Sequence, residues 1–140
     1  MICYKKGDRV VYESKNNSKF LLRYHIIFVC KYRKQLLIKL GDEMKNIMYG
    51  IAERYDFKIL EMEVDKDHIH FMVETEPKIS PMMIIRVLKQ QSTINIWKTN
   101  KDFLRRYYWY KNIFWTDGYF VSTIGEVSSG ILRKYIENQG

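Results

Sequence analysis

Residues 65–74 read DKDHIHFMVE and place His68 and His70 one residue apart in a stretch with the composition of a β-strand. Because successive strand side chains point to opposite faces, both imidazoles share one face while the apolar residues around them share the other. Neutral imidazole is the commonest protein ligand for metal ions, so the pair is half of a candidate metal site. A solvated strand face that carries two histidines is the plainer alternative.

Two polar side chains near the end of the sequence, Tyr135 and Gln139, lie four residues apart among apolar residues at helical spacing. On a helix they would share the middle of an apolar face. A glutamine is unusual there, since burying an amide without a partner costs about 1–3 kcal/mol. Gln139 therefore either reaches solvent at a frayed helix end or lends its carbonyl oxygen to a cation held by the two histidines.

These four residues together suit one reaction. A divalent cation on His68 and His70 would polarise a phosphodiester and neutralise charge in its transition state. The Tyr135 hydroxyl would attack phosphorus and form a covalent phosphotyrosine, although a phenol with a pKa of about 10 needs activation by the metal or a base. The energy of the broken phosphodiester bond is then conserved in the covalent bond between protein and DNA, so rejoining requires no ATP.

The charge balance favours a polyanionic partner, either nucleic acid or an anionic membrane surface, because 24 Lys and Arg residues face 16 acids and leave a net charge of +8. The positive side chains gather in two segments, and the second is interleaved with aromatic residues from Phe103 to Trp115. Those rings could either belong to the core or stack on unpaired bases. The candidate DNA contacts are Lys31, Arg33, Lys34, Arg105 and Arg106.

The length of 140 residues predicts one domain, over 1–140, and an apolar content of 46% argues against disorder. No apolar run is long enough to span a bilayer and the first residues lack a signal peptide, so we expect a cytoplasmic protein without a membrane partner. Cys3 and Cys30 are expected to be reduced thiols, with Cys30 in the core.

The hydrophobic pattern predicts the element order β-α-β-β-α-β-α. Residues 1–20 are expected to lack structure, and His25 is expected to be a core histidine inside the first strand. Ser80 and Pro81 are typical of the start of a helix. The expected strands are 21–32, 57–64, the HIHFMV stretch and 118–125, the expected helices are 38–55, 81–98 and 126–139, and an irregular basic, aromatic connection follows the second helix.

The first six elements predict an α+β fold, a ferredoxin-like (RRM-like) βαββαβ antiparallel sheet with both helices on one face. If those helices cover the apolar face of the HIHFMV strand, His68 and His70 emerge on the open face. Related sheets bind nucleic acid on this face. The C-terminal helix that carries Tyr135 is the only element left to cover it.

The segments YHIIFVCKYRKQLL, EMEVDKDHIHFMVE, FWTDGYFVSTIG and KYIENQ, in this order and spacing, resemble the single-tyrosine (Y1) HUH transposases of the IS200/IS605 insertion-sequence family. The resemblance covers most of the chain. It implies that His68 and His70 are the histidine pair of the HUH motif and that Tyr135 is the nucleophile. It also implies that Gln139 is a further metal ligand and that Asp65 is an acidic residue near the metal.

The same resemblance implies a DNA transposase that cleaves and rejoins single-stranded DNA at the ends of an insertion sequence. Its expected intermediate is a 5'-phosphotyrosine and its expected cofactor is Mg2+ or Mn2+. The expected partners are single-stranded DNA with hairpins at the element ends and a second copy of the chain. In such homodimers the tyrosine helix of one subunit can complete the site of the other.

Three alternatives compete with this interpretation. A cupin-like metal site would use Glu74 with the two histidines, since HIHFMVE also fits H-x-H-x3-E, but a cupin requires a glycine-punctuated all-β barrel. A non-catalytic module that binds single-stranded nucleic acid would explain the charge and the aromatic residues, yet it leaves the histidine pair, Tyr135 and Gln139 unexplained. The third alternative is an inactive copy of a transposase.

Overall fold

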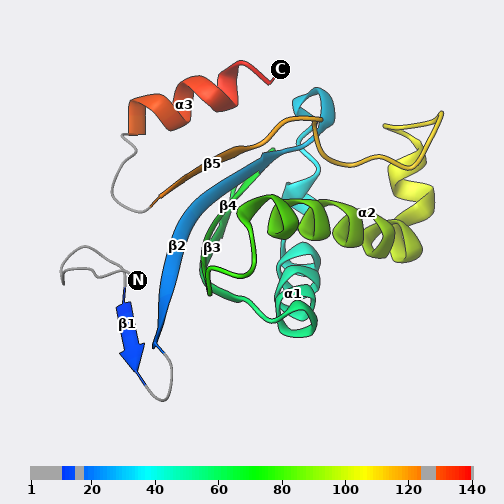
Figure 1. Cartoon of the computed structure of the whole chain (residues 1–140). Coiled ribbons are helices and arrows are strands. Elements are labelled where there is room, and N and C mark those ends of the chain that lie inside the picture. Colours follow the sequence, from blue (N-terminus) through cyan, green and yellow to red (C-terminus); the bar gives the residue numbers. More distant parts are fainter. Residues whose placement is uncertain (1–10, 15–17, 124–128, 140) are drawn as a thin grey trace.

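The computed structural model describes residues 11–14, 18–123 and 129–139 (Figure 1). Its strands are β1 (Val11–Ser14), β2 (Ser18–Val29), β3 (Lys58–Val64), β4 (His68–Thr75) and β5 (Phe120–Thr123). Its helices are α1 (Leu37–Tyr55), α2 (Pro81–Arg105) and α3 (Ser129–Glu137), and a 3-10 turn, η1 (Lys31–Arg33), follows β2.

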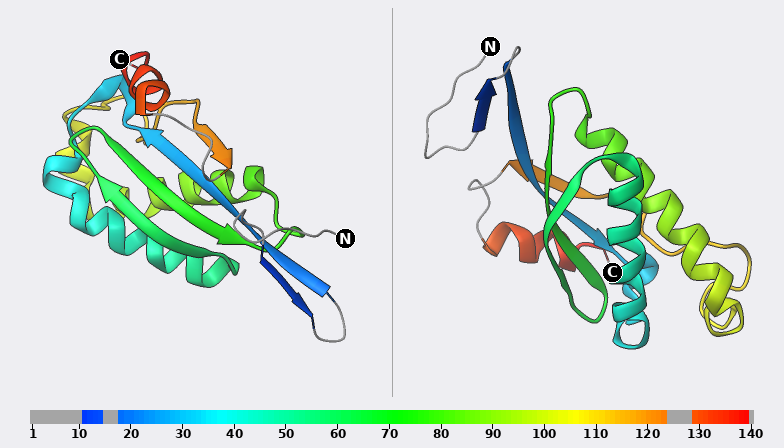
Figure 2. Two further views of the ribbon diagram at one scale, coloured as in Figure 1. Left: turned by 90° about the vertical axis from the view of Figure 1, so that its left-hand side faces the viewer. Right: turned by 90° about the horizontal axis from the view of Figure 1, so that it is seen from below.

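The strands form one antiparallel sheet, in which β2 and β4 lie side by side at the centre and β3 is the edge beyond β4. On the other side of β2, β1 pairs with its first residues and β5 with residues 24–27. The order β5-β2-β4-β3, with α1 and α2 together on one face, confirms the ferredoxin-like α+β fold (Figure 2).

The main core lies between the sheet and its two covering helices. Side chains of β2 and β4 that point to this face are fully buried, and α1 meets them with a stripe of apolar residues at helical spacing. The helix approaches the sheet closely at Gly41, where an added Cβ would lie 3.1 Å from Val64 Cγ1. The buried side chains that define this layer are Ile26, Phe28, Leu40, Met44, Met48, Ile51, Ile69, Phe71 and Val73.

Helix α2 begins as the sequence predicts. The Ser80 hydroxyl accepts a hydrogen bond from the Met83 amide at 3.1 Å, and Pro81 occupies the first turn, where its missing N–H is not needed. These two residues also separate the helix from the preceding loop, so the start of α2 is fixed locally.

We expect Ser80→Ala to lower the free energy of unfolding by about 1 kcal/mol, because the Met83 amide loses its acceptor. Urea denaturation measures the change. Ser80→Asp retains a capping oxygen and should stay close to the wild type. An alanine variant as stable as the wild type would show that Pro81 alone defines this helix end.

The end of α2 differs from the prediction of an irregular segment after Lys98, since the helix continues to Arg105. The extension is stabilised by Leu104, which is fully buried in the core. Its backbone leaves helical geometry at Asn100 (φ −133°, ψ 30°), and the Asn100 amide donates to the Glu43 carboxylate of α1 at 3.0 Å. Tertiary contacts therefore stabilise the helix beyond the irregular backbone at Asn100.

Two other boundaries differ as well. The prediction that residues 1–20 lack structure is wrong for β1 and for the first residues of β2, which pair as a hairpin from Val11 opposite Leu21 to Ser14 opposite Ser18. The last helix ends earlier than the predicted 126–139, because α3 ends at Glu137. Gln139 lies in the turn that follows, and its backbone amide donates to the Ile136 carbonyl. Residues 124–128 of the expected helix and strand lie outside the described residues.

Candidate active site

The strand register places the two histidines on the face of the sheet away from α1 and α2. On β4, His68 pairs with Val29 and His70 with Ile27, while Ile27 also pairs with Phe120 of β5. Paired residues share a face, so these side chains lie together. Figure 2 shows α3 alone on this side of the described sheet, which confirms the predicted open face and its covering helix.

His70 lies against a third histidine. His25 Nδ1 and His70 Nε2 are 3.1 Å apart, so one of them carries the shared proton. His25 is half-buried on the open face, and the expectation of a core histidine is therefore wrong. Burial, together with the nearby His25, lowers the pKa of His70 and favours its neutral form. A neutral imidazole is the form that binds metals.

His68 is held by an acid that sequence reasoning did not select. Asp67 Oδ1 accepts from His68 Nδ1 at 2.9 Å, and its other oxygen accepts from Arg33 Nε at 3.2 Å. Burial opposes ionisation of Asp67, but the hydrogen bonds from His68 and Arg33 outweigh it and lower the carboxyl pKa. This leaves His68 Nε2 as the nitrogen available to a ligand, the arrangement common among metal-binding histidines.

Asp65, the acid that the resemblance suggests, has a different position. Its carboxylate accepts from the Lys66 amide at 2.8 Å, and its own amide donates to the His68 carbonyl, so it closes the β3–β4 turn. It also lines a cavity of about 490 Å³ together with Asp67, His68 and residues of α3 such as Arg133. Asp65 and Asp67 therefore line the same cavity as His68, and of these two acids only Asp67 hydrogen-bonds the His68 ring.

Tyr135 lies on the same face, above β5. Its ring packs on Phe120 with centroids 5.6 Å apart, and its hydroxyl is buried without a hydrogen bond to any described residue. Burial raises the pKa of Tyr135, and the neighbouring Thr116 hydroxyl opposes that rise. Phe120 and His70 both pair with Ile27, from opposite sides of β2, so the residue on which the Tyr135 ring packs lies two strand spacings, about 10 Å, from His70.

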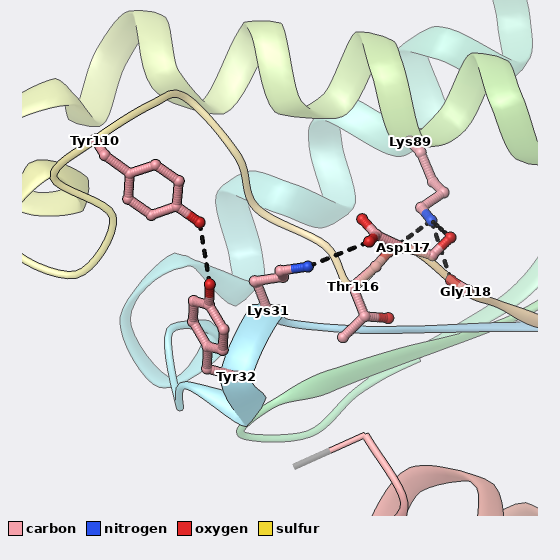
Figure 3. Close-up of polar contacts among 7 residues, drawn as sticks. All are labelled: Lys31, Tyr32, Lys89, Tyr110, Thr116, Asp117 and Gly118. Atoms are coloured by element: carbon pink, nitrogen blue, oxygen red, sulfur yellow. Dashed lines mark hydrogen bonds and ion pairs between the residues drawn. The ribbon is translucent and has the colours of Figure 1, made fainter.

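The segment beneath the Tyr135 hydroxyl is fixed by one lysine. Lys89 of α2 donates from Nζ to the carbonyls of Thr116, Asp117 and Gly118 at 2.7, 3.0 and 3.0 Å (Figure 3). A Cβ added at Gly118 would come within 3.8 Å of the Tyr135 hydroxyl. Burial lowers the pKa of Lys89, with a smaller contribution from Asp117 in the opposite direction.

The donor set suits a divalent cation only in part. Among the described residues, no group of three His, Cys, Asp or Glu side chains is placed to hold a metal. The histidine pair therefore needs an oxygen donor of another kind, such as an amide or a phosphate. Gln139 is half-buried two residues beyond the end of α3, the helix that covers this face.

Of the five basic residues predicted to contact DNA, three have polar partners within the protein and two are exposed. Arg33 is held by Asp67, and Arg105 donates to Asn112 and to the Tyr108 carbonyl while its guanidinium lies over the Trp97 ring. Lys31 is 3.5 Å from the Asp117 carboxylate. The remaining two, Lys34 and Arg106, are exposed.

The aromatic residues near the second basic segment divide between the core and the surface. Tyr108, Phe114 and Trp115 are buried in the core, whereas Trp109 and Tyr110 are exposed. Nowhere in the ranges that the structure describes is there a helix sufficiently long and apolar to cross a membrane.

Known proteins resemble this chain along most of its length. The family described as IS200-like transposases matches residues 18–139. The ISDra2 transposase TnpA of Deinococcus radiodurans is 30% identical over 136 residues, which cover 96% of this chain and 90% of that protein. The transposase for insertion sequence element IS200 of Salmonella typhimurium is 31% identical over 130 residues, covering 91% and 82%.

Solved structures agree with these matches. A crystal structure of a protein from Deinococcus radiodurans R1 superposes with a TM-score of 0.77 at 29% identity, covering 85% of this chain and 91% of that one. A REP-associated tyrosine transposase bound to a REP hairpin shares the fold, with a TM-score of 0.55 at 16% identity over 98% and 69% of the two chains. The chain belongs to the IS200/IS605 family of single-tyrosine (Y1) transposases.

Proposed function

We propose that this transposase cleaves and rejoins single-stranded DNA through a covalent 5'-phosphotyrosine on Tyr135, with a divalent cation bound at His68 and His70. The observation that carries the proposal is the convergence of the histidine pair and Tyr135 on the one face of the sheet that α1 and α2 leave open. Within a transposase family, this constellation supports phosphoryl transfer more directly than binding alone.

The cation, Mg2+ or Mn2+, would be held by His68 Nε2, by a nitrogen of His70 and by oxygen donors that include the Gln139 amide. When bound, it supplies positive charge that polarises the scissile phosphodiester. Asp67 keeps His68 in the tautomer that presents Nε2, and Arg33 keeps Asp67 ionised. Asp65 lines the same cavity and stays a candidate for a further contact.

The nucleophile is the Tyr135 hydroxyl. It loses its proton, its oxygen forms the bond to phosphorus, and the bond from phosphorus to the 3' oxygen breaks, so the leaving strand takes up a proton. Because the Tyr135 ring packs on Phe120 of β5 and its hydroxyl is buried, the proposal includes a movement of α3 that brings the hydroxyl to the scissile phosphate. A homodimer in which α3 of one subunit serves the histidines of the other would meet the same requirement.

The proposed DNA substrate is single-stranded and carries hairpins. A relative of the same fold was solved with a REP hairpin. The net charge of +8 and the five candidate basic residues supply the electrostatic attraction that such a polyanion requires. Lys34 and Arg106 are exposed, although the Arg106 guanidinium also lies 5.2 Å from the centre of the Phe103 ring. Lys31, Arg33 and Arg105 have polar partners within the protein.

A covalent-capture assay tests the proposal. The protein is incubated with end-labelled single-stranded DNA from the ends of its own element, with Mn2+ or with EDTA, and run on a denaturing gel. The expected result is a protein–DNA adduct that requires the metal. Hairpin binding without an adduct would instead support a binding module or an inactive transposase.

The position of Asp67 predicts a specific effect on the metal. Asp67→Asn should weaken Mn2+ binding about 10- to 100-fold, because the His68 ring loses the charged acceptor that orients it. Titration followed by Mn2+ electron paramagnetic resonance measures this without DNA.

Asp65→Asn is the matched control, since the same change is made two residues away in the same cavity. Because Asp65 does not bond the His68 ring, Asp65→Asn should lose less Mn2+ affinity than Asp67→Asn, even if Asp65 adds a contact of its own. If Asp65→Asn lost affinity and Asp67→Asn did not, the orienting role of Asp67 would be wrong and the acid near the metal would be Asp65.

A further inference from the structure

Three exposed aromatic side chains gather at the end of the molecule near η1, and we call them the aromatic platform: Tyr32, Trp109 and Tyr110. They are 53%, 75% and 48% exposed. The Tyr32 and Tyr110 hydroxyls are 3.0 Å apart, and the Trp109 and Tyr110 rings meet edge to face at 5.5 Å (Figure 3 shows the tyrosine pair). Single exposed aromatic residues are ordinary, but three that are linked through Tyr110 form a surface that suggests a ligand.

The platform is built on unusual backbone. Tyr32 and Arg33 both have left-handed conformations, with φ of 62° and 54°, which non-glycine residues rarely adopt in succession. The surrounding structure holds them there, since the Lys31 amide donates to the Phe114 carbonyl and the buried Tyr108 hydroxyl donates to the Lys31 carbonyl. Strain maintained in this way is typical of functional sites.

The loop that carries the other two rings is also fixed. Arg105 donates to the Tyr108 carbonyl and to the Asn112 side chain, and thereby closes the loop on either side of Trp109 and Tyr110. The exposed rings are therefore presented by a braced loop. A preorganised aromatic surface loses little conformational entropy when a flat ligand stacks on it.

Positive charge surrounds these rings. Lys31 Nζ lies 5.6 Å from the centre of the Tyr32 ring and Lys111 Nζ lies 5.9 Å from that of Tyr110. Lys34 is exposed two residues beyond Tyr32. Aromatic faces beside cations match a chain of unpaired bases with its phosphates, whereas a hydrophobic protein surface would not require the cations.

The platform is linked to the candidate active site through Arg33. Arg33 follows Tyr32 directly in the chain, and its guanidinium reaches Asp67, the residue that orients His68. Arg33, Asp67 and His68 line one cavity. A strand whose bases stack at the platform could therefore lead its backbone past Arg33 toward the histidine pair.

We propose that the aromatic platform is a stacking subsite for unpaired bases of the single-stranded DNA that enters this active site. The identity of the DNA rests on the function proposed above, while the stacking itself does not. The subsite adds affinity without reading sequence, because every base presents a flat face.

The test uses an oligothymidylate of about 16 nucleotides with one 2-aminopurine base, in EDTA and with the Tyr135→Phe protein, so that no cleavage occurs. Binding should quench the 2-aminopurine fluorescence. Trp109→Ala combined with Tyr110→Ala should remove most of this quenching and weaken binding about 5- to 100-fold. The slope of log affinity against log salt should not change, since no phosphate contact is lost.

Tyr49→Ala is the matched control. Tyr49 is 46% exposed on α1, so it tests whether loss of any exposed ring weakens binding. Tyr110→Phe, which keeps the ring and removes the hydroxyl pair with Tyr32, should retain quenching and affinity. If the double alanine variant were too unstable to test, Trp109→Ala alone should still reduce the quenching and the DNA affinity, by less than the double variant.

The proposal would be overturned by unchanged quenching in the double variant, or by a loss of affinity in Tyr49→Ala equal to that of the double variant. It would also be overturned if the double variant changed its oligomeric state in sedimentation and still bound DNA as the wild type does. A metal-dependent adduct with the wild type but no effect of the ring substitutions would refute the platform alone. Quenching that depends on the platform without any adduct would refute the catalytic proposal alone.

Discussion

Tyr135→Phe is expected to abolish the covalent protein–DNA adduct, with a loss of about 10³-fold or more, because it removes the oxygen proposed to form the phosphotyrosine. Binding of hairpin DNA should remain, since the ring still packs on Phe120. The buried hydroxyl adjoins Thr116 without forming a hydrogen bond of normal geometry, so its removal breaks none and the fold should be retained. The denaturing-gel capture assay measures the adduct, and a gel shift measures binding.

Tyr119→Phe is the control for this substitution. Tyr119 lies just before β5, and its hydroxyl contacts the Met82 sulfur at 3.2 Å, away from the proposed chemistry. This variant should form the adduct like the wild type. An adduct that persists in Tyr135→Phe and disappears in another tyrosine variant would assign the nucleophile elsewhere.

The buried position of Tyr135 also shows why activation is needed. Burial raises the pKa of this phenol, so at neutral pH it is almost fully protonated. If Tyr135 is the nucleophile, as proposed, its attack therefore needs a base or a cation that stabilises the developing phenolate.

The second large effect is expected from His68→Ala. Removal of this imidazole should lower metal-dependent cleavage at least about 100-fold, because His68 Nε2 is the nitrogen that Asp67 leaves available to the cation. Direct Mn2+ titration should show the loss of affinity independently of cleavage. DNA binding in EDTA should be unchanged, since the basic residues are untouched.

Met72→Ala serves as the matched control, because Met72 lies on the same strand and the same face, two residues beyond His70. It should retain metal binding and cleavage. Full cleavage activity in His68→Ala, with Mn2+ affinity unchanged, would show that the histidine pair is not the metal site.

The principal features of the site could be predicted from local sequence. Strand alternation alone places His68 and His70 on one face, because side-chain direction in a strand has a period of two residues. Ser80 and Pro81 mark the start of α2 by short-range capping chemistry. The motif segments likewise led to the family that the comparisons show.

Other features depend on contacts between distant parts of the chain. Arg33 hydrogen-bonds Asp67 across 34 residues of sequence, and His25 contacts His70 across 45 residues. Both contacts form because the antiparallel pairing of β2 with β4 brings these segments together. No local pattern encodes the register of that pairing, so the sequence did not single out Asp67, and the family resemblance pointed to Asp65 instead. The β1 hairpin and the extension of α2 to Arg105 likewise depend on pairing and burial.

The chain by itself thus determined which chemical groups are available, their order along each element and the family to which they belong. The tertiary structure alone decided which acid orients His68, where the Tyr135 hydroxyl rests, and which aromatic residues face solvent. The physical reason is that periodicity governs the direction of a side chain within its own element. Its neighbours are set by strand register and helix docking, which depend on the packing of the whole domain.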